Sequence, residues 1–408
     1  MKKRVVITGI GPVTSLGIGV RPFFENLLAL KTAIRPIPVE YERHAIFKSR
    51  FCVPFPAFSL GDYVKTRFDS LMEKPAKAAL VGAKLALLDA ALEPPEETTV
   101  ILGIGMGALQ TAFQSHLAHV TSASPTRFNR MVIPMQMPNA ASAWVSILLG
   151  LKGPNFTVNA SCASGTLAIG EAFSRIAAGV CETALAGGVE CLEDESGSTM
   201  RGFDATGALT RSEDGWPRPF SKQRSGFLFA DGGGCVLVLE ELSRARRRGA
   251  RIYAEIGGYV VNSDAHSILQ LEESGAQIKT LLRSLKGNEP IDYLNAHGTG
   301  TLNNDQVEAQ AIQEVFGDHE KQPLINSTKG LLGHTIGASG AMEAAVTALT
   351  ISEGKVHGNL TSDPLENLRL VGATTETPVH AALSLSFGFG GHNAGLLLKK
   401  VSGEKETP

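Results

Sequence analysis

The sequence predicts an α/β protein in which strands and helices alternate along the chain. Short runs rich in β-branched residues recur, and longer segments with a helical pattern of apolar residues lie between them. Glycine accounts for 44 of the 408 residues, about 11% against a usual ~7%, which indicates many tight turns. Alternation of this kind is typical of buried strands that are connected by covering helices.

The elements follow from these patterns in chain order. The first strand comes directly after the basic N-terminal residues, and the last two strands are joined by a glycine-rich turn. The expected strands are residues 4–8, 99–103, 155–158, 183–186, 235–240, 252–261, 291–295, 324–327, 384–387 and 394–399. The expected helices are residues 74–92, 163–178, 276–286, 305–316 and 339–352.

Charge and composition exclude several classes of protein. The chain has 38 basic and 40 acidic side chains and is 43% hydrophobic, which excludes disorder and gives no basic excess for binding nucleic acid. The longest apolar stretch, residues 140–151, is shorter than the ~20 residues of a membrane span. The N-terminal apolar run is too short for a signal peptide, and the five cysteines form no CxxC pair. We expect a soluble, cytoplasmic protein without disulfides.

The chain divides best within the charged segment 240–251. This predicts an N-terminal half, residues 1–245, and a C-terminal half, residues 246–408, which together bury a large core. The tripeptide Ala-Ser-Gly opens one helix at residues 163–165 and another at residues 338–340. This repeated tripeptide only weakly indicates a duplicated fold.

No cofactor or metal motif is complete. The dinucleotide fingerprint that begins in residues 5–11 requires a small residue at position 14, where Thr14 stands. The glycines of residues 103–107 have the wrong spacing as well. No HExxH motif or cysteine pair accompanies the histidines discussed below. We therefore expect neither a nicotinamide or flavin cofactor nor a catalytic metal.

Cys162 lies where a predicted strand passes into a predicted helix. The strand ends near Val158, and small residues from Asn159 to Gly165 lead into the helix. A nucleophile on such a turn needs small neighbours, because the backbone is tight and the substrate must approach closely. The N–H groups and dipole of the helix N-terminus favour the thiolate. A buried, unreactive cysteine is the alternative interpretation of this segment.

Two histidines lie on glycine-flanked loops that follow predicted strands. His297 stands in the sequence Asn-Ala-His-Gly-Thr-Gly-Thr, and His334 ends the sequence Ser-Thr-Lys-Gly-Leu-Leu-Gly-His before a helix that carries Glu343. Side chains of α/β proteins reach their ligands from such loops. The C-terminal turn at residues 387–391 has little side-chain bulk, so it can present backbone N–H groups to an oxyanion. An ordinary tight hairpin is the alternative interpretation.

In this order and spacing, Cys162, His297, Lys329, His334 and Glu343 strongly resemble the β-ketoacyl-acyl carrier protein synthases, the elongating condensing enzymes. The resemblance covers nearly the whole chain, including residues 5–17, 153–154, 186–190, 203–204, 218–220, 231–234 and 262–264. It implies a thiolase fold, in which two duplicated βαβαβαβαβ halves form a five-layered αβαβα structure, usually as a homodimer.

The resemblance also implies a decarboxylating Claisen condensation without a cofactor. Cys162 would take an acyl group from a carrier-protein thioester, and the enolate formed from malonyl carrier protein would attack it. His297 and His334 match the donors to the enolate oxygen, where the chemistry requires two preorganised N–H groups. The backbone N–H groups of Cys162 and Phe389 match a second oxyanion hole. Phe389 also matches the gating residue of its turn.

The remaining matched residues have supporting roles. Lys329, paired with Glu343, would hold an electrostatic and structural position beside the histidines. Thr299 and Thr301 match positions that hydrogen-bond the pantetheine arm of the carrier. Met106 matches a position in the acyl pocket, where a flexible methionine would limit chain length softly.

Acyl carrier protein is the partner that the resemblance implies, together with a second copy of the chain or a related subunit in a heterodimer. Because the carrier is acidic, we expect a basic surface near the entrance. The candidates are Lys65, Arg67, Lys74, Lys77, Arg127 and Arg130. Scattered solvated charges are the alternative interpretation of these residues.

The chain departs from the commonest fatty-acid version at several positions. Gly300, Asn303 and Asn304 stand where that version has Ser, a small residue and Gly. His266 and Ser267 replace a Tyr-His pair, and the loop after them is short. These differences favour a type II polyketide or polyene pathway and leave fatty acid elongation as a rival.

A non-catalytic chain-length partner of a ketosynthase heterodimer is the alternative function. Such partners typically lack the nucleophilic cysteine, whereas Cys162 is present. A biosynthetic thiolase requires a second cysteine near the C-terminus, and no cysteine follows Cys235. An initiating synthase would pair its cysteine with a histidine and an asparagine, which the two-histidine pattern contradicts.

Overall fold

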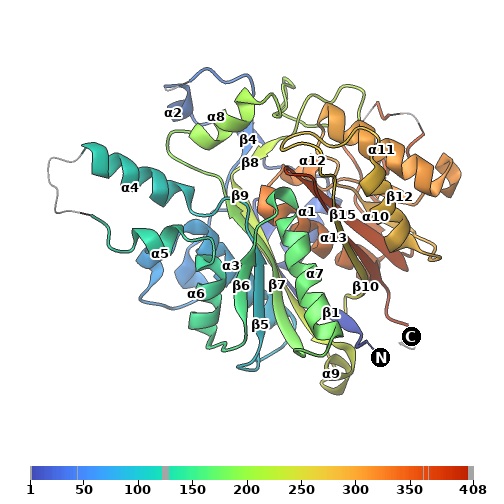
Figure 1. Ribbon diagram of the computed structural model, residues 1–408, viewed down its shortest axis with the longest axis horizontal. Helices are drawn as coiled ribbons and strands as arrows, with labels where there is room; N and C mark the ends of the chain where they lie inside the picture. Colours follow the sequence, from blue (N-terminus) through green and yellow to red (C-terminus); the bar gives the residue numbers. More distant parts are fainter. Residues whose placement is uncertain (1, 44, 122–127, 362, 366, 403–408) are drawn as a thin grey trace.

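The computed structural model describes residues 2–43, 45–121, 128–361, 363–365 and 367–402 (Figure 1). The first half contains β1 (Val5–Thr14), β2 (Gly17–Ile18), α1 (Val20–Leu28), β3 (Arg35–Pro36), α2 (Val39–Glu42), β4 (Phe51–Val53), α3 (Lys74–Asp89), β5 (Thr99–Gly103), α4 (Leu109–Thr121), α5 (Val132–Gln136), α6 (Ala140–Leu149), β6 (Asn155–Val158), α7 (Ser164–Ala177), β7 (Thr183–Cys191), α8 (Ser198–Ala205), β8 (Phe229–Ala230), β9 (Gly232–Glu241) and α9 (Leu242–Arg247). The second half contains β10 (Ala254–Ser263), α10 (Ala276–Lys286), β11 (Tyr293–Asn295), α11 (Leu302–Phe316), β12 (Leu324–Asn326), α12 (Lys329–Leu332), α13 (Ser339–Glu353), β13 (Lys355–Val356), β14 (Thr375–Glu376), β15 (Ala381–Gly388) and β16 (His392–Lys399). The predicted α/β class is confirmed.

The main sheet repeats one topology in its two halves. Its strands lie in the order β12-β11-β15-β16-β10-β1-β9-β7-β5-β6, and β2 pairs with β1. From each edge inward, the strands are the third, second, fourth, fifth and first main strands of that half. The second strand is parallel to the third and the fourth, whereas the fifth is antiparallel to the fourth and the first. The duplicated halves are therefore present in strand order and in strand direction.

The two halves meet where their first strands pair. β1 and β10 are antiparallel neighbours, with Val5 opposite Ile256 and Ile7 opposite Ala254. Each strand also has a register shift toward its other neighbour, between Ile7 and Gly9 in β1 and between Ile256 and Gly258 in β10. The irregularity falls at the fourth residue of both strands, Thr8 and Gly257. The duplication thus extends to a local bulge.

The helices complete five layers (Figure 1). α3 and α6 pack on the strands of the first half, and α10 and α11 cover the second half. α7 and α13 pack against each other and against strands of both halves, so they form the middle layer. The largest hydrophobic cluster accordingly includes Ile7 and Ile169 from the first half with Ala345 and Leu396 from the second. The two halves therefore share one core.

Glycine brings α7 and α13 together at the repeated Ala-Ser-Gly tripeptides. A Cβ atom on Gly165 would lie 2.8 Å from the nitrogen of Ala341, and one on Gly340 would lie 2.1 Å from Oγ1 of Thr166. No side chain fits at either position without displacement of the facing helix. The tripeptides predicted as a faint repeat are structurally equivalent, because each opens a middle-layer helix.

The prediction for the first strand was too short. β1 continues past Thr8 through Gly9, Gly11 and Pro12 to Thr14. The glycines do not end the strand, because they let it pack against the backbone of α3. A Cβ atom on Gly11 would lie 1.9 Å from the carbonyl oxygen of Gly82.

Several helices escaped sequence analysis, notably α1, α4, α5, α6 and α8. The apolar stretch at residues 140–151 forms the ten-residue helix α6. Over the ranges that the structure describes, no helix is long and apolar enough to cross a membrane. The division after residue 245 stays a prediction, and it falls within α9.

Candidate active site

Cys162 lies on a tight turn between β6 and α7. A short 3-10 turn, Ser161–Ala163, connects the strand to the helix, and Ser161 has a φ of +51°. The other half repeats this geometry, since Ile336 has a φ of +46° in the turn Ile336–Ala338 before α13. Left-handed backbone costs energy in a residue with a side chain. The turn places Cys162, which is 5% exposed, at the N-terminus of α7.

The surroundings of the thiol come from both halves of the chain. The Sγ atom of Cys162 lies 3.1 Å from Nε2 of His334, and the backbone N–H of Phe389 points toward it. Burial raises the pKa of the Cys162 thiol, although the Ser161 hydroxyl, the charge of Lys329 and the Phe389 N–H act in the opposite direction. The shift is opposite to the one predicted from the helix N-terminus, because desolvation outweighs the other effects. The thiol therefore needs a proton acceptor when it reacts.

Close approach of the C-terminal turn requires glycine. A Cβ atom on Gly388 would lie 2.8 Å from the carbonyl oxygen of Ala160 and 3.2 Å from the nitrogen of Cys162. The turn after β15 therefore rests directly on the backbone of the thiol-bearing turn. The N–H groups of Cys162 and Phe389 therefore lie on two adjoining turns, and their role as a shared oxyanion hole stays a prediction.

His297 is held in a defined tautomer by Lys329. The ammonium Nζ of Lys329 lies 3.2 Å from Nδ1 of His297 and 2.8 Å from its carbonyl oxygen. An ammonium group only donates hydrogen bonds, so Nδ1 must accept and Nε2 carries the proton. Burial, then the charges of Lys329 and His334, lower the pKa of His297 well below its usual range. The ring is therefore a neutral Nε2–H donor.

His334 has a more adaptable partner. Its Nδ1 lies 3.0 Å from Oγ of Ser339, which also accepts the N–H of Thr335. A hydroxyl can donate or accept, so Ser339 is compatible with a proton on either ring nitrogen. Burial and the charge of Lys329 lower the pKa of His334 well below its usual range. Its ring centre lies 5.6 Å from that of His297, and the planes are nearly perpendicular.

Lys329 and Glu343 form a buried ion pair behind the histidines. Nζ of Lys329 lies 2.5 Å from Oε1 of Glu343, and both side chains are almost fully buried. Burial raises the pKa of Glu343 to about 7, although Lys329 acts in the opposite direction. A buried cation is costly without such a partner. The pair keeps a positive charge beside both imidazoles and so favours their neutral forms.

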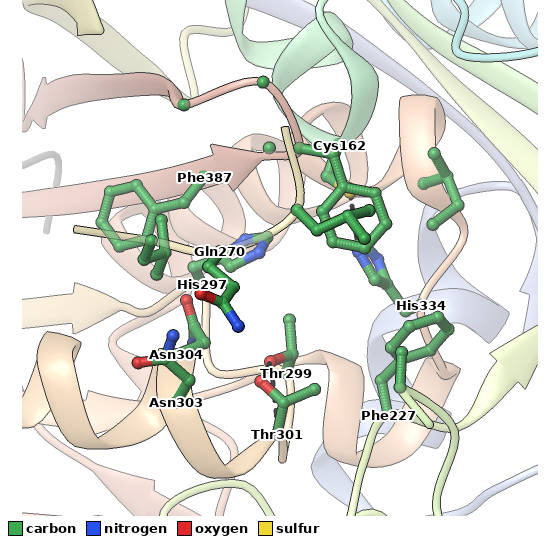
Figure 2. Close-up of a pocket in the computed structure, with 18 residues that line it drawn as sticks. Cys162, Phe227, Gln270, His297, Thr299, Thr301, Asn303, Asn304, His334 and Phe387 are labelled. Carbon is green, nitrogen blue, oxygen red and sulfur yellow. Dashed lines mark hydrogen bonds between the residues drawn. The ribbon is translucent and has the colours of Figure 1, made fainter. Parts of the chain in front are cut away.

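Six of the predicted site residues line one cavity of about 100 Å³ (Figure 2). It brings together Cys162, His297, His334, Thr299, Thr301 and Phe389. The Thr299 and Thr301 hydroxyl oxygens are 2.9 Å apart. Met106 is not among the residues that line this cavity, and it is 45% exposed. Its place in an acyl pocket stays a prediction.

Buried carboxylates that sequence analysis did not single out hold the site loops. Glu190 accepts hydrogen bonds from the backbone N–H groups of Gly105, Met106, Gly107 and Gly337. In the same way, Glu308 accepts those of His297 and Gly298, both at 2.8 Å. For Glu190 the sequence held a signal, an acidic residue within a segment of small or apolar residues, which is unusual for a buried strand; Glu308 stands in a polar segment and gave no such signal.

The structure also bears on metal binding and on the predicted basic surface. In the described part of the chain, no cluster of three or more His, Cys, Asp or Glu side chains could hold a metal ion. Two of the predicted basic residues are paired, Lys74 with Glu193 and Lys77 with Asp69. A third, Arg127, lies outside the described residues.

Comparison with known proteins decides the family. The profile of the Beta-ketoacyl synthase N-terminal domain matches residues 2–245, and that of the C-terminal domain matches residues 253–363. The chain belongs to the beta-ketoacyl synthase family. It is a condensing enzyme of the acyltransferase class.

Two relatives of this beta-ketoacyl synthase are both named 3-oxoacyl-[acyl-carrier-protein] synthase 2. The protein from Staphylococcus aureus (strain COL) is 36% identical over 414 residues, which cover 98% of each chain. The protein from Synechocystis sp. is 35% identical over 425 residues, again 98% of each chain.

Solved structures confirm the thiolase fold. The ishigamide ketosynthase/chain length factor matches with a TM-score of 0.89 and 28% identity, over 98% of this beta-ketoacyl synthase and 100% of that chain. A type II polyketide ketosynthase in complex with its acyl-carrier protein, AntDE:AntF, has a TM-score of 0.87 and 27% identity, with the same coverage. A beta-ketoacyl synthase from Burkholderia phymatum STM815 has a TM-score of 0.87 and 31% identity, also with this coverage.

Proposed function

We propose that this beta-ketoacyl synthase condenses an acyl thioester with malonyl-acyl carrier protein, with loss of CO2, through an acyl group on Cys162. The observation that carries the proposal is the convergence of Cys162, His297 and His334 on one cavity, with a sulfur-to-imidazole distance of 3.1 Å. A thioester bound there meets a nucleophile and two N–H donors in one fixed arrangement.

The first step transfers the acyl group. The Cys162 sulfur attacks the thioester carbonyl carbon, and its proton passes to Nε2 of His334, which Ser339 allows to act as an acceptor. The oxyanion faces the N–H groups of Cys162 and Phe389. As the carbon–sulfur bond to the carrier breaks, the carrier sulfur takes the proton from His334. The products are acyl-Cys162 and a free carrier thiol.

The second step forms the new carbon–carbon bond. Before this step His334 exchanges its ring proton from Nδ1 to Nε2 through solvent, which the Ser339 hydroxyl permits. Malonyl carrier protein then loses CO2, and the electron pair of the broken bond enters an enolate whose oxygen accepts from the Nε2–H groups of His297 and His334. The enolate carbon attacks the acyl carbonyl, and the bond to Cys162 breaks. The 3-ketoacyl thioester stays on the carrier, and the Cys162 sulfur regains a proton from solvent.

The pathway that fits best is type II polyketide or polyene synthesis. Gly300 has a φ of +83°, and a Cβ atom on it would lie 2.4 Å from the carbonyl oxygen of Pro217. The loop is thus shaped for the glycine that distinguishes this chain from the commonest fatty-acid version. Two of the similar structures are type II ketosynthases or carry a chain-length factor in their names. The relatives named 3-oxoacyl-[acyl-carrier-protein] synthase 2 support fatty acid elongation as the rival.

The proposed partners are an acyl carrier protein and a second ketosynthase-like chain. One similar structure is a ketosynthase in complex with its carrier protein. β6 lies at the edge of the sheet order, where a strand of another chain can pair. Exposed apolar side chains occur on or beside the neighbouring helices α4, α5 and α6; they are Leu117, Val120, Ile133, Met137 and Ile147.

Acylation measured by intact mass tests the function. After incubation with an acyl carrier protein, the wild type and Cys181→Ala should gain the mass of one acyl group, and Cys162→Ala should gain none. Cys181 is the matched control, because it is half-buried and lies outside the cavity. Acylation of Cys162→Ala would refute the nucleophile. Failure of the wild type to load would favour the non-catalytic chain-length subunit.

A further inference from the structure

Three amide side chains gather at one end of the cavity. Gln270, Asn303 and Asn304 lie together on the side away from Cys162 (Figure 2). Gln270 and Asn303 are exposed, so this end opens to solvent, whereas Cys162 and His334 are buried at the other end. Asn304 differs from its two neighbours, since it is only 7% exposed.

Two buried carboxylates fix the orientation of the Asn304 amide. Its Nδ2 donates to Oδ1 of Asp305 at 3.1 Å and to Oε2 of Glu308 at 3.2 Å. The same two oxygens accept the backbone N–H groups of Gly298 and Gly300, so they act as acceptors and the nitrogen of Asn304, not its oxygen, faces them. Oδ1 of Asn304 is buried and has no partner among the described residues. It is thus an acceptor without a donor, on a residue that lines the cavity.

The carboxylates that orient Asn304 cannot easily turn away. Glu308 also accepts the N–H groups of His297 and Gly298, and Asp305 accepts those of Gly300 and Phe220. Asn304 is therefore part of the network that shapes the His297 loop. A buried carbonyl oxygen in such a rigid setting is rarely left unpaired, so it calls for an N–H or O–H donor from outside the chain.

The path of a thioester identifies that donor. A thioester whose carbonyl reaches Cys162 must leave the rest of its thiol arm in the open end of the cavity, beside Asn304. We infer that Oδ1 of Asn304 accepts a hydrogen bond from an amide N–H of a pantetheine-type arm and thereby selects such thioesters over those of simple alkyl thiols. The inference rests on the proposed function, which supplies the thioester.

A cycle of enzyme and substrate changes tests this inference. The rate of Cys162 acylation is measured by intact mass with hexanoyl pantetheine, with hexanoyl ethyl thioester, and with two pantetheine analogues in which one amide N–H is replaced by an ester oxygen. The loss of loading rate in Asn304→Ser should be about 10-fold greater with hexanoyl pantetheine than with the ethyl thioester. With the wild type, one of the two ester analogues should load about as slowly as Asn304→Ser loads from hexanoyl pantetheine. With Asn304→Ser, that analogue should load no more slowly than hexanoyl pantetheine does.

Other outcomes would overturn the inference. Equal losses with both thioesters would mean that Asn304 only supports the loop, and a loss confined to a 3-hydroxyhexanoyl substrate would assign the contact to the acyl chain. Wild-type rates that do not distinguish pantetheine from either ester analogue would refute the contact even if the variant folds poorly. Asn288→Ser, an exposed change outside the cavity, is the matched control. If the wild type loads from none of these thioesters, the proposed function itself fails.

Discussion

The two imidazoles of the site differ in how their protons are fixed. Lys329 can only donate to Nδ1 of His297, whereas the Ser339 hydroxyl can donate to or accept from Nδ1 of His334. In the proposed reaction, only His334 can therefore take a proton from the Cys162 thiol and later donate a hydrogen bond to an enolate. His297 is restricted to donation. The two histidines thus differ in the tautomers that they can adopt, because each has a different partner at Nδ1.

This difference predicts the effect of His297→Ala. Loss of one of two preorganised donors should slow malonyl decarboxylation by about 100-fold or more, while acyl loading of Cys162 stays largely unchanged, because no contact joins His297 to the sulfur. Release of labelled CO2 from malonyl carrier protein measures the first rate, and intact mass measures the second. An equal fall in both rates would contradict the division of roles.

His357 predicts a pH dependence of stability. The ring is fully buried and hydrogen-bonds Thr328 and the carbonyl oxygen of Gly358, and burial lowers its pKa to about 4. Between that value and the ~6.5 of the unfolded chain, the unfolded state binds more protons, so the free energy of unfolding rises with pH, by up to about 3 kcal/mol. Below pH 4 the dependence on this group levels off.

Urea unfolding of the wild type and His357→Gln at pH 5 and pH 7.5 checks this prediction. The gain in stability between the two pH values should be smaller in His357→Gln than in the wild type, whatever the substitution costs at either pH. The exposed change His319→Gln is the control and should leave the gain unaltered. An identical gain in His357→Gln and the wild type would remove the claim.

Among the elements, the contact between α7 and α13 is the tightest constraint. Both helices begin three residues after a left-handed residue, and each presents a glycine to the other. The contact positions the thiol-bearing turn of one half against the second half. The spacing of these helices therefore sets the spacing of the reactive groups.

A methyl group at this contact should destabilise the protein. Gly340→Ala places Cβ 2.1 Å from Oγ1 of Thr166, and overpacking of this kind costs about 1–3 kcal/mol. Gly202→Ala, within α8, meets nothing within 4 Å and should be neutral or stabilising. Thermal unfolding of both variants measures the difference. Similar melting temperatures would show that the helices can separate without cost.

At the scale of the whole molecule, the main sheet ends at β6, an edge at which a second chain can dock. The carbonyl oxygens of Pro154 and Val158 accept N–H groups from the β5 side, so the intervening residues Asn155 and Thr157 direct their backbone groups outward. An exposed strand edge of this kind favours pairing with another strand. It lies near the exposed apolar side chains of α4 to α6 that we propose as the rest of the dimer interface.

Thr157→Pro should therefore weaken the dimer. Proline removes an outward N–H and leaves the pairing of β6 with β5 in place. Light scattering after gel filtration should give a dimer mass for the wild type and a smaller mass at equal concentration for the variant. Circular dichroism controls for folding. A wild-type monomer, or a variant dimer of undiminished stability, would exclude this edge from the interface.

Sequence analysis could single out Cys162, His297 and His334 because each lies in a short segment with a distinctive order of residues. Cys162, His297 and His334 are brought into one cavity, although their segments are far apart in the chain. It missed what depends on three-dimensional packing. The sequence suggests that Gly9 and Gly11 form a turn, whereas in the structure they belong to β1 and allow α3 to pack closely against it. The role of Glu190 depends on four backbone N–H groups from two separate loops, which no local pattern reveals.

The paired left-handed turns also limit the loading stoichiometry. The residue that corresponds to Cys162 in the second turn is Gly337, where a Cβ atom would lie 2.4 Å from the nitrogen of Gly105 and 2.8 Å from Oε2 of Glu190. A cysteine at position 337 would not fit, because the backbone of Gly105 and the carboxylate of Glu190 occupy the space. Of the two equivalent turns, only the first can therefore carry a thiol, so under the proposed mechanism each polypeptide holds one acyl group at a time.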